Sequence, residues 1–258
     1  MNMKRALVCG ASKGIGKAIA YKLASEGMEV ILLARGEDDL ARIQEDLDSN
    51  NGQVHKYYAV DFMRPERVVE ALQNELIESH RIHILINNTG GPEPGLLHEA
   101  ELQSLADAFT MHILTSQALM KALLPGMEQA GFGRIVNIIS TSVKEPIDGL
   151  GVSNTIRGAM ASWSKTLSRE LGEKGVTVNN VLPGYTSTER LTEIIDMRAV
   201  TAGVDLEVMT SKLKREVPAN RFALPEEIAG VVSFLCSDSA SYLNGTNITV
   251  DGGRTRCL

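Results

Sequence analysis

The chain has 258 residues, and 43% of them are hydrophobic, which is enough to build the core of one α/β domain. A formal net charge of −6 and an aromatic content of 4% disfavour a nucleic-acid-binding surface. The cysteines, Cys9, Cys236 and Cys257, are far apart, which indicates a reducing compartment and no structural metal. The first strand comes close behind Met1, and no apolar run is long enough to cross a bilayer. We therefore expect a cytoplasmic protein without a signal peptide or a membrane partner.

Apolar strand-like runs and helix-like periodic segments alternate along the chain. The expected strands cover residues 6–8, 30–34, 54–60, 82–86, 134–139, 176–182 and 246–250. A first helix runs on from residue 17, and the other expected helices cover 38–48, 65–78, 102–127, 154–172 and 225–236. Repeated βαβ units predict one α/β domain over residues 1–258. Its core is a Rossmann-like doubly wound parallel sheet of about seven strands, with helices on both faces.

The stretch from Thr188 to Glu216 differs from the rest because it is charged, contains methionine and is only weakly periodic. Two interpretations fit this pattern equally well. It forms two surface helices, or it forms a mobile lid over the functional site.

The first expected strand runs into a glycine-rich turn that opens a helix, with the sequence Gly10-Ala11-Ser12-Lys13-Gly14-Ile15-Gly16. In this context Gly10 permits a tight turn, Gly14 lets the backbone approach a pyrophosphate, and Gly16 lets the helix lie close to the sheet. The first helical turn presents unpaired N–H groups and a positive dipole end to phosphate oxygens. The turn therefore predicts a dinucleotide-binding site.

The charges near this turn indicate which dinucleotide is bound. An NAD-binding protein usually places a carboxylate at the end of the second strand, where it bonds the ribose hydroxyls. Here Ala34 and Arg35 stand at that place, and Lys13 lies inside the glycine turn. Two cations near the ribose 2′ position suit a phosphate, so we expect NADP(H) as the coenzyme.

These stretches together resemble the short-chain dehydrogenase/reductase family along nearly the whole chain, and its 3-oxoacyl-(acyl-carrier-protein) reductases in particular. Besides the glycine turn, the matching motifs are Asp61-Phe62, Asn87-Asn88-Thr89-Gly90, the strand 134–139 ending at Ser140, Pro183-Gly184 followed by Thr188, and Asp251-Gly252-Gly253. The resemblance implies that the coenzyme is bound by Gly10, Ser12, Lys13, Gly14, Ile15, Gly16, Arg35, Asp61, Phe62, Asn88, Thr89, Gly90, Arg157, Pro183, Gly184 and Thr188. It also implies hydride transfer between NADP(H) and a small carbonyl or alcohol substrate. The expected assembly is a homotetramer or homodimer, with the helices 102–127 and 154–172 at the interface.

The catalytic positions of that family are changed in this chain. The family uses an asparagine, a serine, and a tyrosine that precedes a lysine by four residues. The serine is retained as Ser140, but the other positions hold His112, Ser153 and Arg157. A tyrosine phenol has a reference pKa of about 10 and can act as an acid, whereas a serine hydroxyl is far less acidic. Arginine can hold ribose hydroxyls but does not relay protons as lysine does.

Several groups remain candidates for the missing proton donor. Tyr185 follows the Pro-Gly loop, and it is either an acid or an apolar wall of the pocket. His112 has a suitable reference pKa near 6.5, but a histidine packed in a helix and bonded to a carbonyl is as plausible. A water between Ser153 and Arg157 is a third route. Two functions follow: a carbonyl reductase with a non-standard proton donor, or a dinucleotide-binding sensor or partner subunit with impaired catalysis.

Overall fold

The computed structural model describes residues 3–76 and 81–257, and its strands form one parallel sheet. The strand order is β3-β2-β1-β4-β5-β6-β7. The bounds are β1 Arg5–Cys9, β2 Glu29–Ala34, β3 Lys56–Ala59, β4 Ile84–Asn87, β5 Gly133–Ile138, β6 Val176–Pro183 and β7 Asn247–Val250. The chain winds outward from β1 in both directions, so the order reverses between β1 and β4. Ligands of open α/β sheets bind outside the carboxyl ends of the strands at such a reversal.

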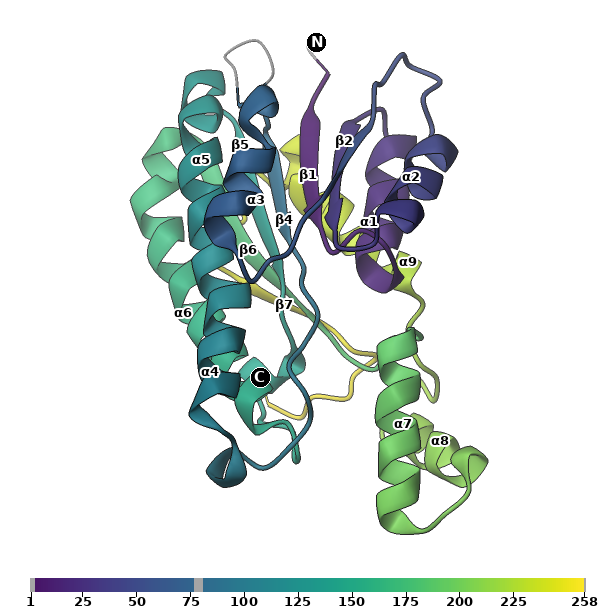
Figure 1. Ribbon diagram of the computed structural model, residues 1–258. Coiled ribbons are helices and arrows are strands. Elements are labelled where there is room, and N and C mark those ends of the chain that lie inside the picture. The colour runs from purple at the N-terminus through teal and green to yellow at the C-terminus, as the bar shows by residue number, and fades with distance from the viewer. Residues whose placement is uncertain (1–2, 77–80, 258) are drawn as a thin grey trace.

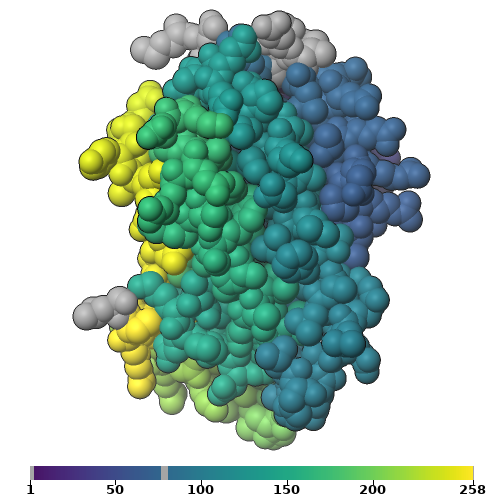
Figure 2. All heavy atoms as spheres, turned by 90° about the vertical axis from the view of Figure 1, so that its left-hand side faces the viewer, coloured from purple at the N-terminus to yellow at the C-terminus, as the bar shows by residue number. Residues whose placement is uncertain are grey.

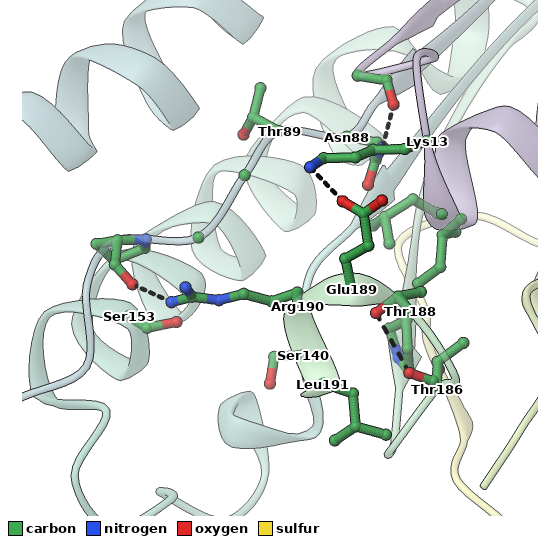
Figure 3. Close-up of a pocket in the computed structure, with 18 of the residues that line it drawn as sticks. Lys13, Asn88, Thr89, Ser140, Ser153, Thr186, Thr188, Glu189, Arg190 and Leu191 are labelled. Atoms are coloured by element: carbon green, nitrogen blue, oxygen red, sulfur yellow. Dashed lines mark hydrogen bonds and ion pairs between the residues drawn. The ribbon is translucent and has the colours of Figure 1, made fainter. Parts of the chain in front are cut away.

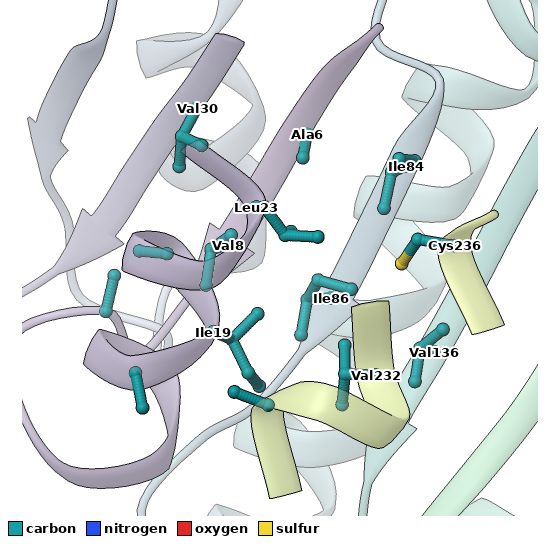
Figure 4. Close-up of a cluster of buried hydrophobic side chains, with 14 of the residues drawn as sticks. Ala6, Val8, Ile19, Leu23, Val30, Ile84, Ile86, Val136, Val232 and Cys236 are labelled. Atoms are coloured by element: carbon teal, nitrogen blue, oxygen red, sulfur yellow. The ribbon is translucent and has the colours of Figure 1, made fainter. Parts of the chain in front are cut away.

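Helices cover both faces of the sheet, as Figure 1 shows. One face packs against α1 Gly14–Ser25, α2 Glu37–Asp46 and α9 Pro225–Cys236, and the other against α3 Pro65–Ala71, α5 Thr115–Ala130 and α6 Gly151–Leu171. Alternate strand residues supply the two cores, because successive side chains point to opposite faces. Figure 4 shows one of them, where Val8 and Ile86 of the sheet meet Ile19 of α1 and Val232 of α9. The predicted α/β class is confirmed.

The expected helix over 102–127 is interrupted. It consists of α4 Leu102–Phe109, a π-helical turn at Thr110–Leu114, and α5. The Thr115 hydroxyl donates to the carbonyl oxygens of Phe62 at 2.6 Å and Thr110 at 3.2 Å. Single π turns inside α-helices are frequent at functional sites, and His112 lies within this one.

The helix expected over residues 65–78 is shorter than predicted. The α-helix α3 ends at Ala71 and a 3₁₀ turn follows at Gln73–Glu75. Positions 77 and 78, where the predicted helix ends, lie outside the described residues.

The stretch from Thr188 to Glu216 forms two helices, α7 Glu189–Ala202 and α8 Leu206–Arg215. They project beyond the carboxyl ends of the strands in Figure 1. A separate small core joins them, made of Leu191, Ile195, Ala199, Met209 and Leu213. Two packed helices are therefore present, whereas a lid movement stays a prediction. In the described part of the chain, no helix has both the length and the apolar character needed to span a membrane.

A buried charge network ties β1 and β3 to the turn after α3. Glu75 is 1% exposed and accepts hydrogen bonds from Arg5, Lys56 and Tyr58 at 2.5, 2.8 and 2.6 Å. Burial by itself would raise the pKa of Glu75, but these hydrogen bonds and the charge of Arg5 lower it to about 2. The network lies at the opposite edge of the sheet from the cleft described next, so we assign it to stability.

Candidate coenzyme and catalytic site

A cleft of about 2260 Å³ lies at the carboxyl ends of the strands. It runs from the glycine turn after β1 past Ser140 and Ser153 to the first turns of α7 (Figure 3). Every residue that the sequence suggested for the site lines it except Gly16. The fold thus gathers these residues from well-separated parts of the chain, as a doubly wound sheet requires.

The glycines of the first turn have distinct positions. Gly10 and Gly14 have φ angles of +61° and +56°, a region that favours glycine. A Cβ on Gly10 would overlap the carbonyl oxygen of Asn88, and one on Gly16 would overlap the carbonyl oxygen of Gly10. A Cβ on Gly16 would also lie 2.6 Å from Nδ2 of Asn88, so Gly16 lets the first turn of α1 lie close to the residues that follow β1 and β4. A Cβ on Gly14 would lie 3.2 Å from Cγ2 of Thr188, so this glycine keeps the turn open beside the Pro-Gly loop.

Lys13 and Arg35 lie at the entrance of the cleft, where the sequence predicts a site for the 2′-phosphate of the coenzyme ribose. Arg35 is exposed at the end of β2. The ammonium of Lys13 pairs with the carboxylate of Glu189 at 2.5 Å, across the cleft on the first turn of α7 (Figure 3). This hydrogen bond raises the pKa of Lys13. The carboxylate of Glu189 on α7 therefore already forms an ion pair with one of the two cations, Lys13.

The remaining predicted coenzyme contacts are held in place by the backbone. Asn88 donates from its amide to the carbonyl oxygens of Cys9 and Gly10, both at 3.3 Å, and so joins the end of β4 to the glycine turn. Asp61 accepts from the N–H of Met63 at 3.0 Å, which fixes the turn after β3. Ser12, Ile15, Phe62, Gly90, Pro183 and Gly184 complete the wall of the cleft.

Arg157 is a buried cation at the end of the cleft where the candidate catalytic residues Ser140 and Ser153 lie (the catalytic end). Its side chain comes from α6, the residue is 8% exposed, and Nη1 donates to the carbonyl oxygen of Ile138 at 3.0 Å. Burial lowers its pKa to about 10, so the guanidinium stays protonated at neutral pH. No carboxylate forms an ion pair with it among the described residues. Its remaining donors are therefore available to hydroxyl or anionic groups of a ligand.

His112 lies beneath the cleft in the π turn and is 4% exposed. Its Nδ1 is 2.6 Å from the hydroxyl of Thr89, and its buried Nε2 has no hydrogen-bond partner among the described residues. Burial, and then the charge of Arg157, lower its pKa well below the ordinary value. The imidazole is neutral at physiological pH, which disfavours it as the acid.

Ser140 and Ser153 both line the catalytic end of the cleft, from the end of β5 and the first turn of α6. The oxygen of Ser140 accepts the N–H of Ser142 at 3.0 Å. Within the described residues no acceptor takes the Ser140 hydroxyl hydrogen, so it is free to point at a substrate carbonyl. Both side chains are half-buried.

Tyr185 lines the cleft, but its hydroxyl already makes hydrogen bonds. It donates to a carboxylate oxygen of Glu216 at 3.1 Å and accepts from Nη1 of Arg198 at 3.2 Å. Its ring packs edge-on against Phe222, with ring centroids 5.9 Å apart. These contacts favour a wall residue over a proton donor.

Sequence reasoning missed the contacts that α7 makes across the cleft. Arg190 donates to the carbonyl oxygen of Pro92 at 2.9 Å and pairs with Glu193 at 3.0 Å. Figure 3 shows Arg190 stretched from α7 over the part of the cleft that contains Ser140 and Ser153. A charged helix gives no sequence signal for such contacts, because the partner is a backbone carbonyl about one hundred residues away.

Comparison with known proteins places this site in a family. A protein-family model described as enoyl-(acyl carrier protein) reductase matches residues 10–255 of the chain. The chain belongs to the short-chain dehydrogenase/reductase family. The 3-oxoacyl-(acyl-carrier-protein) reductase FabG of Vibrio cholerae is 34% identical over 252 residues, covering 97% of this chain and 96% of the relative. The NADPH-dependent reductase BacG of Bacillus subtilis is 28% identical over 260 residues, covering all of both chains.

Solved structures of this family superpose closely on the chain. The L-sorbose reductase of Gluconobacter frateurii, complexed with NADPH and L-sorbose, has a TM-score of 0.92 at 30% identity, covering 100% of this chain and 98% of that one. YwfH, an NADPH-dependent reductase involved in bacilysin biosynthesis, has a TM-score of 0.91 at 27% identity over all of both chains. The family, the Rossmann-like fold and the oxidoreductase class expected from the sequence are confirmed.

Proposed function

We propose that this family member binds NADP(H) in the cleft and reduces the carbonyl group of a small substrate to an alcohol. The glycine turn carries this proposal. Gly10 and Gly14 adopt positive φ angles and Gly10 and Gly16 leave no room for a Cβ, so the backbone turns tightly into α1, whose N-terminus is the place where a pyrophosphate binds in such folds. Lys13 and Arg35 at the entrance suit a 2′-phosphate, and NADPH appears in the names of the relatives.

Each polar group at the catalytic end has a distinct task in this proposal. When bound, the reduced coenzyme supplies the hydride. Ser140 donates a hydrogen bond to the substrate oxygen. Arg157 holds the hydroxyls of the nicotinamide ribose with the N–H groups that do not bond the carbonyl oxygen of Ile138. Ser153, one helical turn before Arg157, would hold a water that passes a proton to that oxygen, and bulk solvent would return a proton to this water. The engaged hydroxyl of Tyr185 and the neutral His112 favour this route over the other two.

The carbonyl substrate is proposed at the level of class. The FabG relatives are 3-oxoacyl-(acyl-carrier-protein) reductases, so 3-oxoacyl thioesters are the first compounds to test. The loop 90–95 forms part of the cleft wall and is joined to the start of α6: Gly95 donates to the carbonyl of Gly149 at 2.7 Å, and Gly151 donates to that of Gly95 at 3.0 Å. This loop shapes the pocket beside Ser153.

A second function is a coenzyme-binding sensor or partner subunit without useful turnover. The absence of a phenol at position 153 favours it, because loss of a general acid typically costs about 10²- to 10⁴-fold in rate.

One experiment separates the two functions. NADPH binding is titrated by fluorescence, and NADPH oxidation is followed with a panel of ketones, sugars and 3-oxoacyl thioesters. The reductase is supported if the wild type reduces any panel member, and if Ser140→Ala abolishes this reduction while its dissociation constant for NADPH stays unchanged. Binding of NADPH without oxidation on any compound supports the sensor, and absence of binding contradicts both.

We further propose that the protein forms a homotetramer or homodimer. Its subunits would contact one another through the face made by α4, α5 and α6, which is turned toward the viewer in Figure 2. Leu102 of α4 is 84% exposed, and Phe109 and Leu114 are 43% and 45% exposed. Apolar side chains gathered along one helix favour a protein contact. Sedimentation of the wild type and of Leu102→Glu tests this interface.

A further inference from the structure

We propose that the substrate carries a carboxylate, which Arg198 and Arg254 bind on either side of Tyr185. This inference deepens the proposed function, on which it rests, by naming a feature of the substrate that the coenzyme site does not determine. It starts from the wall that separates the main cleft from a smaller cavity of about 390 Å³.

Tyr185, Arg198 and Arg254 belong to that wall, since they line both cavities. The carboxylates near them, Glu145, Asp148 and Glu216, line the smaller cavity only. On the side of the main cleft, a ligand therefore meets two guanidinium groups and a phenol without a facing carboxylate from this cluster. An anion is the complementary ligand for such a surface.

The two arginines have donors to spare. Arg198 is half-buried, makes one hydrogen bond, to Tyr185, and forms no ion pair among the described residues. Arg254 has 20% of its side chain exposed and lies over the Tyr185 ring, with Cζ 4.5 Å from the ring centroid. Its Nε is buried without a hydrogen-bond partner in the described chain, and Glu216 Oε2 is 3.9 Å away. Among the described residues, Glu216 is the one carboxylate within ion-pair distance of either arginine, and Glu145 and Asp148 line the smaller cavity without pairing with them.

The position of the pair suits substrate rather than coenzyme. Apart from Arg157, the coenzyme residues lie in the glycine turn and at or after the ends of β2, β3, β4 and β6, whereas Arg198 lies two turns into α7 and Arg254 follows β7. Along α7, Arg190, Ile194 and Arg198 recur every four residues and all line the main cleft. Arg190 lies over the catalytic end, and Arg198 is about 12 Å further along the helix axis, at 1.5 Å per residue. A substrate reduced at Ser140 can therefore extend along α7 and place a remote charge at Arg198.

Carboxylate is the chemistry that these groups recognise best here. A guanidinium fork matches its two oxygens, and charge-assisted hydrogen bonds of this type are about twice as strong as neutral ones. The phenol of Tyr185 holds both arginines: it accepts from Arg198, and its ring supports Arg254. The site is preorganised by protein contacts before a ligand arrives.

The test compares acids with their methyl esters, which keep the carbonyl chain and remove the charge. We would measure dissociation constants of 5-oxohexanoate and 7-oxooctanoate and of both esters, with the protein saturated in NADP⁺. Wild-type protein should bind at least one acid about ten- to a hundredfold more tightly than its ester. Arg198→Gln and Arg254→Gln should reduce that ratio to near one, and Arg198→Lys should restore part of it. Arg215→Gln, an exposed change of the same charge on α8, should leave it unchanged.

Three outcomes would overturn the proposal: equal binding of acids and esters, no binding of either acid, or a preference for acids that survives both glutamine variants. NADPH affinity and melting temperature, measured on every variant, exclude general damage to the fold. Tight NADPH binding with reduction of neutral ketones alone would leave the proposed function intact and remove only the carboxylate site. Loss of NADPH binding in the wild type would remove both.

Discussion

Glu189→Gln should tighten the binding of NADPH. Glu189 pairs with Lys13 across the entrance of the cleft, so a 2′-phosphate must displace its carboxylate to reach the ammonium group. The glutamine keeps the size of the side chain and removes the competing charge. The 2′-hydroxyl of NADH has no charge with which to compete, so its affinity should change little.

The exposure of the pair limits the size of the effect. The side chains of Lys13 and Glu189 are 68% and 69% exposed, so water screens their attraction. Exposed ion pairs are worth about 0.2 to 1 kcal/mol, which corresponds to an NADPH dissociation constant lowered by about 1.4- to fivefold. The gain should shrink at high salt, where exposed charges are screened further.

Fluorescence titrations of NADPH and NADH at two ionic strengths measure these changes. Glu207→Gln on α8 is the control, because this residue is exposed and does not line the cleft. Unchanged or weaker NADPH binding in Glu189→Gln would refute the reasoning, and so would an equal gain for NADH.

Four further changes test other parts of the structure. Arg35→Asp should shift the ratio of NADPH to NADH affinity toward NADH; an unchanged ratio contradicts the phosphate assignment. Ser153→Tyr with Arg157→Lys should raise kcat for ketone reduction about tenfold or more, since a general acid is worth about 10²- to 10⁴-fold; no gain indicates a rearranged site. Gly16→Ala should abolish NADPH binding in calorimetry while circular dichroism stays native, because its Cβ overlaps the turn. Glu75, whose pKa falls from 4.5 to about 2 on folding, stabilises the protein above pH 4.5, and this stability is lost as the pH falls toward 2. Urea unfolding should therefore show Glu75→Gln about 3 to 5 kcal/mol less stable at pH 7, a gap that narrows toward pH 3; a constant gap refutes the network's role.

Local patterns were sufficient for the sheet and the coenzyme turn. Continuous apolar runs such as 30–34 identify strands that are covered on both faces. Gly10 and Gly14 predict a tight turn, because glycine readily adopts the positive φ angles that the structure shows at both positions. Ser140, Ser153 and Arg157 were found because their spacing within a family motif is short. Their gathering into one cleft follows from a parallel sheet, whose strands all end at one edge.

What the sequence could not decide depends on contacts between distant segments. The π turn at His112 is followed by Thr115, whose hydroxyl donates to the distant carbonyl of Phe62, and the pairing of Lys13 with Glu189 spans 176 positions. The sequence by itself identified the fold class and the candidate side chains for binding a phosphorylated dinucleotide, and it predicted Ser153 and Arg157 at two catalytic positions. Only the tertiary structure decided that Arg157 is buried without a carboxylate and that the hydroxyl of Tyr185 is engaged. Burial and ion pairing are properties of the packed chain, and no local pattern encodes them.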